Sequence, residues 1–332
     1  MTRRTSRPAL AAAIALVAAT LALNGSPVSA AYPERPITLL VGFAPGGSMD
    51  LSARVLAGSV EKILKQPVVI ESKTGGTGTV ALSAMLSQEP DGYTLCATPS
   101  SVIIRVSQMQ QVPFKPFKSF RPIFGFATPP LGIVVKSDSP WKSLKDLANS
   151  ARANPGKIKY ATTGVGSTTQ AAVDAIALKE KLQMIHVPYK GSIEALTSLM
   201  GGHVEFASLT SEFVASVKSG QTRVLATMNE KRSPKFPKTP TLKEEGYSFV
   251  NDAVYAVVAP SNLPPEVAAK LEAAFAEATK NEEYLAALDK INMEPACYSG
   301  KDFSDFLRSQ WKEINRHLKA AGLIKEAATK PE

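Results

Sequence analysis

The stretch FAPGGSMD at residues 43–50, called here the first loop, constrains the fold more than any other. An apolar run rich in β-forming residues (37–41) precedes it and predicts a buried strand. Apolar residues then recur at helical spacing over residues 51–64, so a helix is expected to begin near Ser48, with Ser48 or Asp50 as its cap. The two glycines allow close approach to the backbone, and the N–H groups of a helix start attract anions.

The chain repeats this construction at residues 160–169, YATTGVGSTT, called here the second loop. A short β-like run (157–160) leads into it, and Ala172, Val173 and Ile176 follow at helical spacing. One such turn alone can be no more than a tight strand-to-helix connection. Two copies far apart in the chain predict two lobes, each with one helix N-terminus turned toward a ligand between them.

Strands and helices alternate along much of the chain. Residues 37–97 predict a β-α-β-α-β order and residues 131–209 repeat the alternation, which is typical of parallel sheets covered by helices. In such sheets, ligands bind beyond the carboxyl ends of the strands. We therefore predict an α/β fold of two lobes, the second inserted in the first. Lobe I comprises residues 31–128 and 251–332, and lobe II comprises residues 129–250.

Three further segments carry weaker signals. Residues 112–122 are rich in Pro, Phe and Lys and predict an irregular surface connection, and residues 231–240 predict another. From residue 266 onward the pattern predicts two or three amphipathic helices, separated near residues 292–300.

The first thirty residues have the pattern of a secretory signal peptide. Residues 1–7 carry three arginines, residues 8–23 are mostly Ala, Leu and Val, and VSA at residues 28–30 forms a small-residue cleavage site. Cleavage after Ala30 would lower the formal net charge from +9 to +6, because it removes the three arginines. No later segment is long and apolar enough to cross a membrane, so an exported protein is expected.

The remaining chemistry-bearing residues do not predict catalysis. The chain has three histidines, none beside a nucleophile motif, and it lacks both GxSxG and GxxxxGK[ST]. Cys96 lies in an apolar run and is expected to pack as a small hydrophobe, although export would permit a disulfide with Cys297. We expect no metal site, no cofactor and, because the basic residues are scattered, no nucleic-acid partner.

Several segments, in this order, resemble the solute receptors of tripartite tricarboxylate transporters, also known as the Bordetella uptake protein family. They are YPxRPI at residues 32–37, FAxGGxxD at 43–50, QPVVIE at 66–71, PDGYTL at 90–95, GxGS at 164–167, VPYKG at 187–191, LMGGHVE at 199–205 and AP at 259–260. Each segment alone is weak, but the set spans essentially the whole mature chain.

The resemblance implies a type II periplasmic binding protein, in which two α/β lobes close on a small carboxylate. It implies one large and one small membrane subunit as partners, a monomer, a periplasmic location and no enzymatic turnover. The ligand could be a di- or tricarboxylate, an aromatic acid or an acidic amino acid. Together with the two loops, it predicts these ligand contacts: Phe43, Ala44, Gly46, Gly47, Ser48, Asp50, Gly76, Ser100, Ser101, Thr163, Gly164, Gly166, Ser167, Thr168 and Tyr189.

This sequence departs from the family pattern near the predicted crossing between the lobes. Val254-Tyr255-Ala256 stands where the family usually has Trp-x-Gly, which leaves the size of the pocket and the identity of the ligand open. Two other functions also stay open: an exported enzyme acting on an anionic substrate, and the ligand-sensing partner of a signalling system. We further expect that Gly47→Val and Gly166→Val each abolish binding while the protein stays folded.

Overall fold

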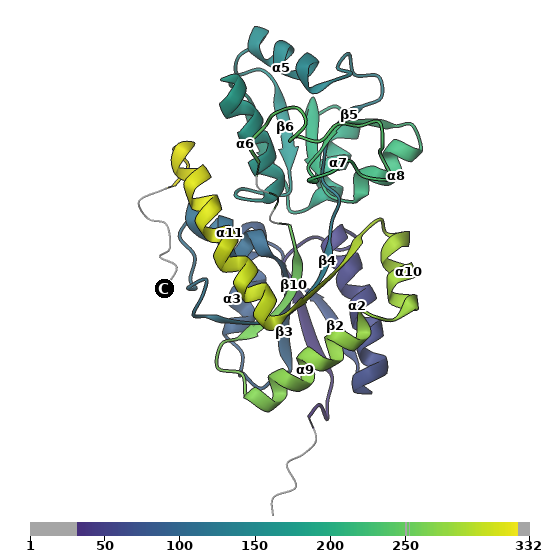
Figure 1. The fold of residues 1–332 in the computed structure, drawn as a ribbon, viewed down its shortest axis with the longest axis vertical. Coiled ribbons are helices and arrows are strands. Elements are labelled where there is room, and N and C mark those ends of the chain that lie inside the picture. The colour runs from purple at the N-terminus through teal and green to yellow at the C-terminus, as the bar shows by residue number, and fades with distance from the viewer. Residues whose placement is uncertain (1–31, 250, 252, 325–332) are drawn as a thin grey trace, which may run out of the picture. The chain divides into compact units, whose positions relative to one another are not determined.

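The strands of the protein form two separate sheets (Figure 1). The computed structural model describes residues 32–249, 251 and 253–324, so the predicted signal peptide lies outside the described residues. The strand order is β11-β4-β10-β3-β1-β2 in one sheet and β7-β6-β8-β5-β9 in the other. We call the parts built on these sheets lobe I and lobe II. Residues 35–332 form one compact unit.

The sheet of lobe I is partly parallel and partly antiparallel. Strand β1 pairs in parallel with β2 and β3, which confirms the predicted β-α-β-α-β start, whereas β10 runs antiparallel to β3 and β4, and β11 runs antiparallel to β4. The strands are β1 (Ile37–Val41), β2 (Val68–Ser72), β3 (Thr94–Pro99), β4 (Phe120–Thr128), β10 (Tyr255–Pro260) and β11 (Glu294–Ser299).

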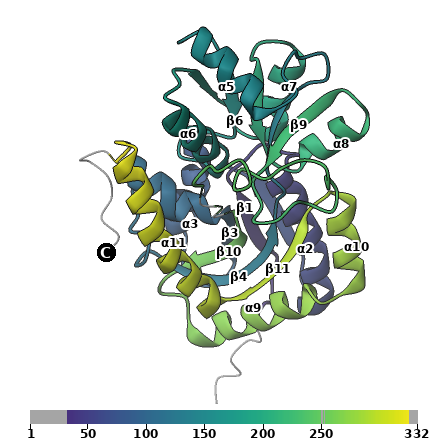
Figure 2. The same cartoon turned by 45° about the horizontal axis from the view of Figure 1, so that its top comes forward.

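Helices cover both faces of this sheet. In Figures 1 and 2, α11 lies on one side of the sheet, and α2 and α10 lie on the other. The predicted C-terminal helices are confirmed as three, with β11 between the last two. The helical segments are α2 (Ser48–Leu64), η1 (Gly76–Gly78), α3 (Thr79–Leu86), η2 (Val102–Val106), α4 (Ser107–Met109), α9 (Pro265–Ala278), α10 (Glu282–Lys290) and α11 (Gly300–Ala320).

Lobe II has its own sheet and its own hydrophobic core. Strand β6 pairs in parallel with β7 and β8, and β5 runs antiparallel to β8 and β9. Buried side chains such as Phe206 and Ile176 fill one face of the sheet, and Phe213 and Leu199 fill the other. The elements are β5 (Gly132–Lys136), α5 (Leu144–Ala153), β6 (Lys159–Thr162), α6 (Thr168–Glu180), β7 (Ile185–Pro188), α7 (Ser192–Met200), β8 (Phe206–Leu209), α8 (Glu212–Lys218) and β9 (Thr222–Thr227).

The chain passes between the two sheets twice, from β4 to β5 and from β9 to β10. Lobe II is therefore inserted in lobe I, as predicted. Ser100 fixes the second passage: its N–H donates to the Val254 carbonyl at 2.8 Å, and the Val254 N–H donates to the Ser100 hydroxyl at 3.1 Å. The boundaries after residues 128 and 250 stay a prediction.

The prediction of an irregular connection over residues 112–122 was wrong at its C-terminal end. Strand β4 begins at Phe120, because the Phe120 and Ile123 side chains are buried in lobe I. Pro122 has no backbone N–H to donate to a neighbouring strand. It is tolerated there because the β10–β4 pairing shifts register beside it, so the regular pattern of hydrogen bonds is already interrupted.

The two cysteines are free, as the packing interpretation of Cys96 requires. Cys96 is buried in β3, and this burial raises the pKa of its thiol, whereas Cys297 is exposed. Among the described residues, no helix combines the length and the apolar character needed to cross a membrane.

Candidate functional site

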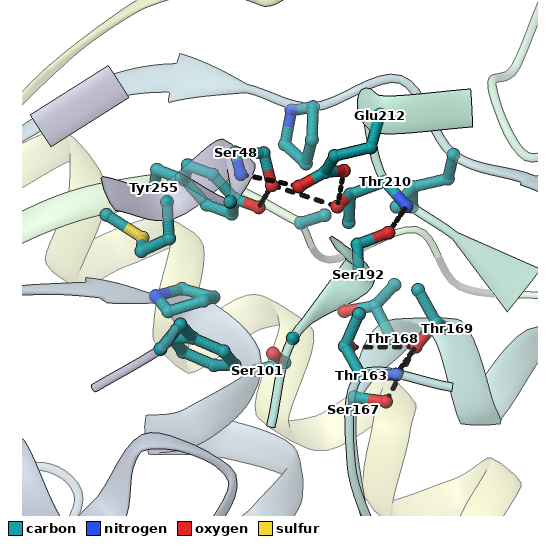
Figure 3. A pocket seen from close by; sticks show the side chains of 18 of the residues that line it. Ser48, Ser101, Thr163, Ser167, Thr168, Thr169, Ser192, Thr210, Glu212 and Tyr255 are labelled. Carbon is teal, nitrogen blue, oxygen red and sulfur yellow. Dashed lines mark hydrogen bonds between the residues drawn. The ribbon is translucent and has the colours of Figure 1, made fainter. Parts of the chain in front are cut away.

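A pocket lies where the first loop, the second loop and the start of β10 meet (Figure 3). It contains about 550 Å³ of empty space, open solvent included. Apolar side chains supply much of the wall, and hydroxyl groups supply most of the polar atoms. Its lining residues are Phe43, Ala44, Gly47, Ser48, Met49, Pro99, Ser101, Pro129, Leu131, Thr163, Ser167, Thr168, Thr169, Gly191, Ser192, Ile193, Thr210, Glu212, Ala253 and Tyr255.

Asp50 bonds the backbone of the first loop and does not line the pocket. Its carboxylate accepts the Gly46 N–H at 2.9 Å and pairs with the Arg54 guanidinium at 2.8 and 3.0 Å. The expected cap was wrong: Gly47 is the N-cap of α2 and has no side chain, so neither Ser48 nor Asp50 caps the helix. The Gly46 N–H is thereby already paired, so it is no donor for a ligand.

A carboxylate does sit at the N-terminus of α2, and it belongs to Glu212 of lobe II. The Ser48 N–H donates to one Glu212 oxygen at 2.6 Å, and the Thr210 hydroxyl donates to the other at 2.7 Å. The Ser48 hydroxyl in turn bonds the hydroxyls of Thr210 at 2.9 Å and Tyr255 at 3.0 Å. This network confirms that the helix start attracts an anion, and it shows that a side chain of the protein is the occupant.

The second loop satisfies its backbone N–H groups with neutral side chains. The Thr163 N–H donates to the Thr169 hydroxyl at 3.1 Å, and the Gly166 N–H donates to the side-chain amide oxygen of Gln170 at 2.6 Å. Ser167 caps α6 by accepting the Gln170 N–H at 3.2 Å. These N–H groups, which we expected to reach the ligand, are therefore paired within the loop, and the pocket presents its hydroxyls instead.

The pocket gathers about half of the predicted ligand contacts. Phe43, Ala44, Gly47, Ser48, Ser101, Thr163, Ser167 and Thr168 line it. Gly46, Asp50, Gly76, Ser100, Gly164, Gly166 and Tyr189 do not line it, and their direct ligand contact stays a prediction.

Those seven residues have structural contacts of other kinds. The Gly76 carbonyl accepts the Thr79 hydroxyl, Ser100 ties the second crossing, and the Tyr189 hydroxyl bonds Ser198. Gly164 and Gly166 have φ of +130° and +78° and lie against lobe I, where a Cβ would come within 2.6 Å of Thr77 and 3.2 Å of Val106, respectively. They allow close approach of the lobes rather than of a ligand.

Sequence reasoning missed most of the lobe II wall. Thr210 and Glu212 follow directly after β8, at the same strand-to-helix position as the two loops. The sequence could have indicated these two residues, because polar side chains directly after a predicted strand lie where ligands bind in α/β folds, and the predicted alternation ended at residue 209. No such signal exists for Pro129 or Ala253, which line the pocket because both crossings pass beside it.

None of the three histidines lines this pocket. His186 stacks on Tyr160 at 5.0 Å between ring centroids and bonds the Thr162 hydroxyl at 2.6 Å, and burial lowers its pKa to about 4. No group of three or more metal-ligating side chains occurs within the described ranges.

The sequence model of the tripartite tricarboxylate transporter family receptor matches residues 52–323. The chain belongs to this family. It is 36% identical over 317 residues to the Cupriavidus necator "UPF0065 protein in gbd 5′ region", and the match covers 95% of this chain and 97% of that protein.

Solved structures agree with this assignment. The periplasmic binding protein BugD has a TM-score of 0.84 at 27% identity, with 89% of this chain and 100% of BugD covered. R. palustris Rpa4515, solved with adipate, has a TM-score of 0.83 at 26% identity, with 88% and 98% covered. The likeness confirms the predicted two-lobed fold of periplasmic binding proteins.

Proposed function

We propose that this receptor captures a small carboxylate in the pocket between the loops and delivers it, without turnover, to a tripartite membrane transporter. The observation that carries the proposal is the Glu212 carboxylate at the N-terminus of α2, which is held in the pocket by one N–H group and one hydroxyl. Rpa4515, a structural neighbour with adipate bound, supports the same ligand class.

The ligand contacts that we propose are the eight predicted residues that line the pocket, joined by Thr169, Ser192, Thr210 and Tyr255. Hydroxyl groups predominate in this set, so recognition rests on hydrogen bonds rather than on a cationic side chain. Export to the periplasm by the predicted signal peptide and a monomeric state complete the proposal. N-terminal sequencing of the exported protein should begin at Ala31.

A thermal-shift screen over mono-, di- and tricarboxylates, aromatic acids and acidic amino acids tests the ligand class. A true ligand at about 100 times its dissociation constant stabilises the protein by about 2.7 kcal/mol. If no acid shifts the transition and calorimetry detects no heat, the proposed function is wrong. Steady conversion of a binding acid to product would contradict the absence of turnover.

Substitution of two serines, one in the pocket and one outside it, tests whether the acid binds in this pocket. Ser101 lines the pocket, whereas Ser107 is equally buried nearby and bonds the Ile103 carbonyl. Ser101→Ala should weaken the affinity for the acid at least tenfold by removing a charge-assisted bond, and Ser107→Ala should leave that affinity unchanged. Equal effects of the two substitutions would place the site elsewhere.

A further inference from the structure

We infer that Glu212 restricts the ligand to an acid with a single carboxylate and an apolar body, and that it excludes dicarboxylates of similar length. The inference rests on the proposed function and assigns Glu212 the role of a specificity determinant. It starts from the fact that the polar end of the pocket at α2 is already occupied by a negative charge.

Two hydrogen bonds hold the Glu212 carboxylate in place. Its two oxygens accept bonds from the Ser48 N–H and the Thr210 hydroxyl, and Thr210 itself bonds the Ser48 hydroxyl. The side chain therefore reaches from α8 of lobe II to α2 of lobe I and fills the strongest anion position that the pocket offers. A ligand carboxylate at the same place would have to displace it.

No Lys or Arg lines the pocket within the described residues. The Arg54 guanidinium pairs with Asp50, which does not line the pocket. A second ligand carboxylate beside Glu212 would therefore meet a like charge without a counter-ion, in a setting where water screens less than in bulk.

The opposite end of the pocket can take one carboxylate. Ser101 is 4% exposed and lines the pocket, and its hydroxyl makes no hydrogen bond within the described part of the chain. Figure 3 shows Ser167, Thr168 and Thr169, at the start of α6, as a polar group separate from that of Glu212, Ser48 and Tyr255. One carboxylate at Ser101 and α6 would be supported by hydroxyls and by the helix start.

Much of the remaining pocket wall is apolar. Phe43, Met49, Pro99, Leu131 and Ile193 line it and offer no polar side-chain partner. An alkyl or aromatic body fits this wall, since burial of its surface is favourable and leaves no ligand polar group unpaired.

Calorimetry with pairs of acids of about the same length tests the inference. In each pair, one acid has a single carboxylate and the other has a second carboxylate at its far end. Hexanoate should bind at least tenfold more tightly than adipate, and benzoate at least tenfold more tightly than terephthalate. Adipate or terephthalate binding as tightly as its partner would overturn the inference and leave the proposed function standing. If no acid of either pair binds, the inference fails, and the proposed function fails with it only when no acid of the thermal-shift screen binds either. Tighter binding of 6-aminohexanoate than of hexanoate would mean that Glu212 pairs with a cation, and would also overturn it.

The variant Glu212→Gln tests whether this side chain causes the preference for monocarboxylates over dicarboxylates. Gln keeps the size and an acceptor for the Ser48 N–H but removes the charge. The preference for hexanoate over adipate should fall at least fivefold, and it should stay unchanged in the control Glu194→Gln, which alters a carboxylate of lobe II that bonds the Lys190 N–H outside the pocket. An unchanged preference in folded Glu212→Gln would refute the role of Glu212. The wild-type comparison decides the ligand class even if this variant does not fold.

Discussion

The first and second loops each lead from a strand to a helix start, but the groups that complete them differ in charge. Carboxylates surround the first loop: Asp50 bonds the Gly46 N–H, and Glu212 bonds the Ser48 N–H. Neutral groups complete the second, where Thr169 and Gln170 accept the corresponding backbone donors. The two loops have the same local pattern, but an anion would meet negatively charged side chains at the first and neutral ones at the second.

The difference teaches that a Gly-rich turn before a helix predicts the ability to bind an anion, but not that the position is free. Side chains from elsewhere in the chain can fill it. Glu212 is far from Ser48 in the sequence and reaches it only because lobe II packs against lobe I. Four predictions test how far the two loops differ.

The largest effect is expected at the glycines. Gly166 has φ of +78°, and a Cβ would lie 3.2 Å from the Val106 Cα, so Gly166→Val should destabilise the fold by about 2–4 kcal/mol. This corrects our expectation that the variant stays folded. Gly47 has φ of −77°, which any residue adopts, so Gly47→Val should keep the fold and disturb the pocket through Glu212.

Urea denaturation of both variants, beside calorimetric titration with a ligand acid, measures this contrast. Gly156→Val is a useful control, because its φ of +69° is also positive but a Cβ there meets no neighbouring atom. Equal stability of the Gly47 and Gly166 variants would contradict the difference between the loops.

Asp50 gives the next effect. Its side chain is buried, so Asp50→Ala leaves the Gly46 N–H and the Arg54 guanidinium without their acceptor, and should cost about 1.5–3 kcal/mol of stability. Asp50→Asn keeps one acceptor for Gly46 and should cost less. Because Asp50 does not line the pocket, folded Asp50→Asn should bind the ligand acid normally in calorimetry. A large loss of affinity with unchanged stability would mean that the charge of Asp50 acts on the ligand.

Two titratable side chains near the second loop, His186 and Asp174, predict opposite changes of folding stability with pH. Burial lowers the pKa of His186 from 6.5 to about 4, so between these values the unfolded chain binds the extra proton, and stability falls as the pH falls. Burial raises the pKa of Asp174 from 3.8 to about 6, so in that range the folded chain binds the extra proton, and stability falls as the pH rises.

The two effects partly cancel in the wild type, which makes the net change small. Thermal unfolding between pH 4.5 and 6.5, a window of about two units chosen from these shifts, separates them. His186→Gln should lose less stability on acidification than the wild type, and Asp174→Asn should lose more. Parallel curves for the three proteins would be evidence against both assignments.

The smallest effect is expected at Tyr255. Tyr255→Phe removes a buried hydroxyl bonded to Ser48, which keeps its bond to Thr210, so the cost should be about 1 kcal/mol. Tyr284→Phe removes a buried hydroxyl bonded to the Phe126 carbonyl outside the pocket and should cost a similar amount. Chemical denaturation compares the two, and only Tyr255→Phe should alter ligand affinity. An affinity change in Tyr284→Phe alone would contradict the placement of the pocket.

The sequence by itself determined the local elements and the family. Apolar periodicity identified β1, α2, β6 and α6 because burial of one face requires it, and the ordered motifs identified the receptor family that the match over residues 52–323 confirms. It also predicted that the two Gly-rich loops and Ser101 face one ligand, and residues of both loops and Ser101 line the same pocket.

Only the tertiary structure decided which donors remain available. Whether the Gly46 N–H meets Asp50 or a ligand depends on a side-chain direction, and whether Ser48 meets Glu212 depends on the packing of one lobe against the other. Local spacing cannot encode the contact with Glu212, because hydrogen bonds between distant residues exist only once the backbone has brought them within about 3 Å. The charge of the pocket is therefore a property of the assembled lobes and not of either loop.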